Sequence, residues 1–105
     1  MKADFQVRDK HYQAEISPGG SKTEDEKFEL YSAAVGSQDG GAVEGTLKIT
    51  PQAIELAGER ATKEGGSAED WLARGCARSL AAEVLIRNLK PEFSFIVDHR
   101  WIRAV

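Results

Sequence analysis

The chain has 105 residues, of which 41% are hydrophobic and 30% charged, and its formal net charge is −3. These fractions are typical of one globular domain and exclude collagen-like, mucin-like and globally disordered chains. No apolar run approaches the roughly 18–20 residues of a membrane-spanning helix, and the first residues lack the apolar stretch of a signal peptide. The single cysteine cannot form an intrachain disulfide. We therefore expect one cytoplasmic domain over residues 1–105, with no cofactor and no membrane partner.

The apolar alternation of the first segment changes phase once, between Val7 and Tyr12. A two-residue turn at Asp9-Lys10 accounts for the change by placing Val7 opposite Tyr12 on one face of a hairpin. The other face is then polar throughout, as a solvated sheet face requires, although Asp4 lies opposite Glu15. One long strand with a β-bulge at Asp9-Lys10 would produce the same phase change. The hairpin is the favoured interpretation.

A polar segment follows over residues 17–27. It contains a Ser-Pro-Gly-Gly turn signal and a run of charged residues, and it holds no apolar side chain. Such a composition does not bury surface, so we expect a mobile loop within the domain.

Two further strands, over residues 28–35 and 42–49, flank a glycine-rich turn. Closing this turn with Val35 opposite Ala42 pairs apolar residues on one face and opposite charges on the other. The core face that this register predicts for the first of these strands carries Phe28, Leu30 and Ala34.

Two helices are predicted next. Thr50-Pro51 is typical of a helix start, and Gly65-Gly66 ends a first helix that runs to about Glu64. Ser67 opens a capping box that starts a second helix, which we expect to continue to about Leu89 before Pro91. The apolar residues of the second helix spread over most of its circumference, which is typical of a helix buried on two sides.

The chain closes with alternating apolar residues over 92–103, which we expect to form a long strand paired inside the sheet. The predicted fold is α+β: a four- to five-stranded antiparallel sheet, in the order β-β-β-β-α-α-β, with two helices packed on one face.

The helices carry more apolar surface than one sheet needs, and we find no convincing catalytic constellation. We therefore expect a non-enzymatic domain that binds another protein or associates with itself as a homodimer. The expected interaction surface lies on the second helix and consists of Arg74, Arg78, Ala81, Leu85 and Leu89.

An alternative function is single-stranded nucleic-acid binding, through aromatic residues that stack with bases on a sheet surface beside arginines. The residues concerned are Tyr31, Arg100, Trp101 and Arg103. A sequence pI near 5.4 disfavours this alternative, because nucleic-acid-binding domains usually carry clustered positive charge.

A second alternative is a small enzyme that uses Glu83 as a general base together with His99. An ion pair between Glu83 and Arg87, one turn later, and a hydrogen-bonded core histidine at position 99 are the favoured interpretations. Cys76 is expected to be a small packing residue and His11 a solvated side chain. The two histidines and one cysteine match no metal-ligand spacing, so no metal site is predicted.

Overall fold

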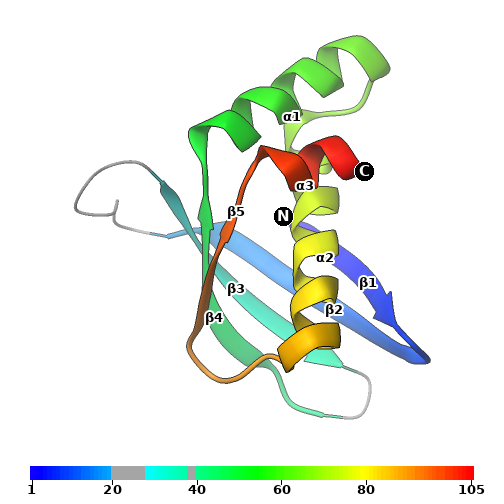
Figure 1. Ribbon diagram of the computed structural model, residues 1–105, viewed down its shortest axis with the longest axis vertical. Coiled ribbons are helices and arrows are strands. Elements are labelled where there is room, and N and C mark those ends of the chain that lie inside the picture. The colour runs from blue at the N-terminus through cyan, green and yellow to red at the C-terminus, as the bar shows by residue number, and fades with distance from the viewer. Residues whose placement is uncertain (20–27, 38–39) are drawn as a thin grey trace.

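The computed structural model describes residues 1–19, 28–37 and 40–105. Figure 1 shows a curved sheet with one long helix lying across it and two further helices gathered at one end of that helix. The elements, in chain order, are β1 (Lys2–Val7), β2 (Lys10–Pro18), β3 (Glu29–Ser37), β4 (Val43–Ile49), α1 (Pro51–Glu64), α2 (Ala68–Arg87), β5 (Phe93–Val97) and α3 (His99–Ala104).

The predicted α+β class and strand order are confirmed, in a five-stranded sheet ordered β1-β2-β3-β4-β5. The sheet is mixed and not antiparallel throughout as predicted, since β5 pairs parallel to β4 whereas β1 to β4 are antiparallel. The reason is the path of the chain, in which α1 and α2 return it to the end of the sheet where β4 begins (Figure 1). Two strands joined by such a crossover run in the same direction.

The first hairpin forms, but its turn is Arg8-Asp9, because Val7 pairs with Lys10. The predicted turn at Asp9-Lys10 is therefore wrong by one position, and the predicted pairing of Val7 with Tyr12 is wrong by two positions. A register shift of two residues keeps every side chain on its predicted face. It also places Lys2, in place of Asp4, opposite Glu15, so an attractive charge pair replaces a repulsive one.

The predicted loop over residues 17–27 starts too early, because β2 extends through Pro18. Ser17 and Pro18 pair with β3, and the Gly19 backbone N–H donates to the Leu30 carbonyl at 2.6 Å. Residues 20–27 of that loop lie outside the described residues, as do residues 38–39 of the predicted turn between β3 and β4.

The predicted register of β3 with β4 is wrong by one residue, since Val35 pairs with Val43 and not with Ala42. Consequently Ala33 and Val35 face the core, and Leu30 and Ala34 lie on the opposite face. The cause is β2, on the other side of β3, whose buried Ala14 and Ile16 stand opposite Val35 and Ala33. A central strand must match two neighbours, and apolar pairing with β2 determines which of its faces is buried.

Both predicted helices form with their predicted caps. The Thr50 side chain accepts a hydrogen bond from the Ala53 backbone N–H, and Ser67 and Asp70 form the capping box of α2. The second helix ends at Arg87, two residues earlier than predicted. Thus the local capping chemistry places both helix starts correctly.

The predicted strand over 92–103 is wrong beyond Val97, where α3 begins. Asp98 caps this short helix by accepting a hydrogen bond from the Arg100 backbone N–H at 3.0 Å. The helix turns Ile102 into the core, where it is fully buried against Gly75 of α2. An added Cβ on Gly75 would lie 2.3 Å from the Ile102 Cδ1 atom, so the glycine permits this close packing.

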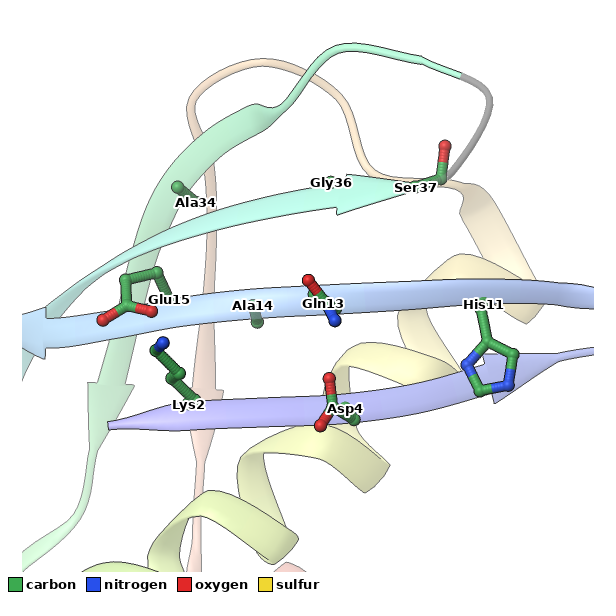
Figure 2. A pocket seen from close by; sticks show the side chains of 9 residues that line it. All are labelled: Lys2, Asp4, His11, Gln13, Ala14, Glu15, Ala34, Gly36 and Ser37. Atoms are coloured by element: carbon green, nitrogen blue, oxygen red, sulfur yellow. The ribbon is translucent and has the colours of Figure 1, made fainter.

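One hydrophobic core lies between α2 and the sheet. Its largest fully buried members are Ile16, Leu47, Ile49, Cys76, Leu80, Val97 and Ile102. α2 contacts β1 and β5, while α1 packs against α2 and α3. One face of the sheet is therefore covered, and the other, which we call the open face, carries mostly polar side chains (Figure 2).

Candidate functional site

A groove runs between β1, which is one edge of the sheet, and the exposed side of α2. It has an alanine-rich helical wall with two arginines, and a Trp101 side chain from α3 closes one part of it. The residues that line this groove are Asp4, Phe5, Gln6, Arg74, Ala77, Arg78, Ala81, Ala82, Trp101 and Val105.

In the sheet that residues 1–19, 28–37 and 40–105 form, β1 is an edge strand, and part of its backbone points outward. Met1 and Ile16 exchange both backbone hydrogen bonds, at 2.6 and 2.8 Å, so they form a hydrogen-bonded pair of the antiparallel ladder. Such pairs alternate along the strand with pairs whose N–H and C=O groups point away from the partner. It follows that Lys2, Asp4 and Gln6 direct their backbone groups to the outside of the sheet.

Three residues of the helical wall, Arg74, Arg78 and Ala81, belong to a stripe that continues along α2 beyond the groove to Leu85. Arg74, Arg78, Ala81 and Leu85 are spaced by four, three and four residues, which places them on one helix face. Arg74 packs its guanidinium group over the Trp71 ring, 4.5 Å from the ring centroid, and Arg78 is exposed. We call these four residues the α2 stripe.

The stripe ends in an apolar tip. Leu85 is 57% exposed and Ile86 is 72% exposed, and both lie beside the β1–β2 turn, where they border a second hollow with Val7 and Arg8. Leu89 was predicted on the same surface, but it lies apart from it. Its half-buried side chain borders a hollow with Val35 and Val43.

Sequence reasoning missed the other half of the groove. Phe5 and the backbone edge of β1 belong to it because β1 is an edge strand, and no local pattern states which strand ends a sheet. Trp101 was assigned to a strand surface, whereas α3 brings it to the groove. The Asp98 cap was the one available signal, since aspartate directly before a helix is a common N-cap.

The four residues of the nucleic-acid alternative do not share a strand surface, since Arg100, Trp101 and Arg103 lie in α3 and Tyr31 in β3. Burial and the neighbouring Glu29 carboxylate raise the pKa of Tyr31, whose hydroxyl donates to Glu29 at 3.5 Å. Arg100 forms an ion pair with Asp98 at 2.7 Å. This bond lowers the pKa of Asp98 and raises that of Arg100.

The two residues of the enzyme alternative lie on different helices. Glu83 pairs with Arg87 at 3.4 Å, which confirms the predicted ion pair. His99 is the first residue of α3, and α3 contacts α2 at Gly75. Eight residues of helix, about 12 Å, separate Gly75 from Glu83.

Cys76 is fully buried in the core, as predicted, and burial raises its thiol pKa to about 12. A thiol with this pKa carries almost no thiolate at neutral pH and is a poor nucleophile. His11 is exposed on the open face, also as predicted.

A shallow hollow occupies the part of the open face formed by β1, β2 and β3 (Figure 2). It spans β1 to β3, where Ala34 and Gly36 of β3 are small and the longer side chains come from the other two strands: Lys2, Asp4, His11, Gln13 and Glu15. All five of these surrounding residues are exposed, so the hollow is a solvated face without a buried polar group.

In the part of the chain that the structure describes, no three histidine, cysteine, aspartate or glutamate side chains gather where they could hold a metal ion. Across the same residues, no helix has both the length and the apolar character needed to cross a membrane. Comparisons of the chain with models of protein families, with curated proteins and with solved structures returned no match.

Proposed function

We propose that this chain is a non-enzymatic protein-interaction domain, and that it binds another polypeptide, or a second copy of itself, in the groove between β1 and α2. The observation that carries the proposal is the outer edge of β1, which pairs with no other strand among the described residues, next to the α2 stripe. Edge strands with free backbone groups readily accept a further strand.

Two features support a binding role for this edge over a merely solvated one. β1 is regular over all six of its residues and contains neither a proline nor a bulge, two of the usual devices that protect an edge. The wall beside it offers alanine and tryptophan surface next to arginine, and arginine and aromatic residues are enriched at protein interfaces.

The proposal is tested by selecting peptides from a random library on the immobilised chain, and by sedimentation of the free chain over a range of concentrations. We expect enriched peptides, or self-association, that the Ala81→Glu variant abolishes. Ala81 is a half-buried residue of the groove wall. Ala42→Glu is the matched control, because Ala42 is exposed and does not line the groove.

The Leu85→Glu variant tests self-association separately, because it places a charge on the apolar tip of the α2 stripe. A chain that stays monomeric, with selected peptides that bind Ala81→Glu as tightly as wild type, would overturn the proposed function. Circular dichroism shows whether each variant has kept its helices.

A further inference from the structure

We infer that the occupant of the groove is an extended acidic segment of a partner protein, which adds to the sheet as a sixth strand beside β1 and places carboxylates on Arg74 and Arg78. This inference rests on the proposed function and names the chemistry of its partner. Strand addition of this kind obtains affinity from backbone hydrogen bonds and specificity from alternate side chains.

The backbone of β1 provides the first half of the site. Lys2, Asp4 and Gln6 each direct one N–H and one C=O outward, so a short extended segment finds both donors and acceptors along the edge. The side chains of Lys2 and Asp4 lie on the open face (Figure 2). They therefore leave the edge itself accessible to another backbone.

The two arginines provide the second half. Arg74 and Arg78 are four residues apart, which is about 6 Å along a helix axis. Side chains at positions i and i+2 of a strand point to the same face and lie about 6.8 Å apart. An added strand beside β1 would cross α2 obliquely, as β1 does (Figure 1), and acidic residues at alternate positions on its α2-facing side would offer carboxylates to this pair of arginines.

Charge favours such a segment over a second copy of this chain. If two β1 strands paired, each would present Ala3, Phe5 and Val7 to the helix side of the other, because these are the residues that β1 directs toward α2. None of them carries a carboxylate, so the arginines of both copies would lack an opposite charge from the added strand. An acidic strand supplies that charge through hydrogen bonds with ionised groups, which are stronger than neutral ones.

The test uses the full chain, labelled with ¹⁵N, and a capped synthetic peptide in which threonine and glutamate alternate. We expect amide hydrogen exchange to slow at Asp4 and Gln6, whose N–H groups point outward. Exchange at Ala3 and Phe5 stays unchanged, because their amides already bond to β2. This alternation distinguishes an added strand from any ligand that merely covers the surface.

Three controls accompany this measurement. The peptide with glutamine in place of glutamate tests the charge, and a peptide N-methylated at alternate residues tests the backbone bonds. Arg74→Gln and Arg78→Gln should each lower the affinity for the acidic peptide about threefold, as expected for an exposed ion pair. The two substitutions together should lower it roughly tenfold. Both arginines are exposed, so these variants should fold.

Several outcomes would overturn the inference. Equal binding of the glutamine peptide removes the acidic specificity but leaves the interaction domain intact. If the acidic peptide or an oligothymidylate shifts the signals of α2 without slowing exchange at Asp4 and Gln6, the groove is a diffuse anion-binding surface and no strand is added. If no peptide binds, the inference is wrong, while the library selection and sedimentation decide the proposed function separately.

Discussion

The two halves of α2 have the same backbone and opposite environments. From Trp71 to Leu80 most residues of the helix are buried against the sheet, α1 and α3, and Arg74 and Arg78 are the exposed exceptions that line the groove. Beyond Val84 no residue of the helix is buried, and Leu85 and Ile86 are largely exposed. One helix therefore stabilises the fold with its first half and offers apolar surface with its second.

Trp71 shows how tightly the first half is held. Its indole N–H donates to the Gly65 carbonyl at 2.9 Å, and the guanidinium groups of Arg60 and Arg74 lie 4.1 and 4.5 Å from its ring centroid. Cation–π contacts of this kind stabilise by roughly 0.5–1 kcal/mol at exposed sites. Among the described residues, the second half has only the Glu83–Arg87 pair as a polar side-chain contact of this kind, and its apolar tip is exposed.

The largest difference in stability is expected between two variants that carry the same substitution, leucine to alanine, in the two halves of α2. Leu80→Ala removes a fully buried side chain and should lower the free energy of unfolding by about 2–5 kcal/mol, through lost burial and the cavity that remains. Leu85→Ala should change it by no more than about 0.5 kcal/mol, because the side chain is already 57% exposed. Urea unfolding of both variants measures the difference. Similar losses in the two variants would mean that the helix is enclosed along its whole length.

A second comparison uses two helical glycines. Gly75→Ala should lower the free energy of unfolding by about 1–3 kcal/mol, because the new methyl group would overlap Ile102 and push α3 outward. Gly58→Ala in α1 should instead stabilise by about 0.5–1 kcal/mol, since its Cβ would meet no atom within 4 Å and alanine favours helix. Thermal unfolding reports both signs. A neutral or stabilising Gly75→Ala would show that α3 does not depend on close packing there.

The helix starts, the first hairpin and the α2 stripe were predictable from the local sequence. The caps at Thr50 and Ser67, and the alternation of the first hairpin, depend on neighbouring residues and were interpreted correctly apart from a two-residue register shift. The stripe from Arg74 to Leu85 could also be recognised, because helical spacing alone places its members on one face.

The errors arose where distant parts of the chain decide the structure. The register of β3 depends on β2 as well as on β4, so the β3–β4 turn alone was insufficient. The segment after Val97 alternates like a strand, yet the Asp98 cap and the space beside Gly75 favour a helix there. The groove was missed for the same reason, since it requires knowledge that β1 is at the edge of the sheet and that Trp101 reaches it.

A third and smaller loss of stability is expected at the Asp98 cap of α3, which packs on the first half of α2. Asp98→Ala removes the cap and the Arg100 ion pair, and should cost about 1 kcal/mol at neutral pH. The folded-state pKa of Asp98 lies below its ordinary value of 3.8, chiefly because of its hydrogen bond with Arg100. Its charge-dependent stabilisation is therefore complete above the unfolded-state pKa and is lost as the pH falls through the lowered folded-state pKa.

Asp98→Asn separates the two contributions of this residue. Asparagine also caps helices well but carries no charge, so the variant should keep most of the stability at neutral pH. Its difference from wild type should vanish in acid, where wild-type Asp98 is itself protonated, while Asp98→Ala stays less stable than both. Urea unfolding measured from neutral pH down to below pH 3.8 tests this ordering. If Asp98→Asn were as unstable as Asp98→Ala at neutral pH, the ion pair and not the cap would hold α3 against α2. The stability of the first half would then depend on an exposed charge.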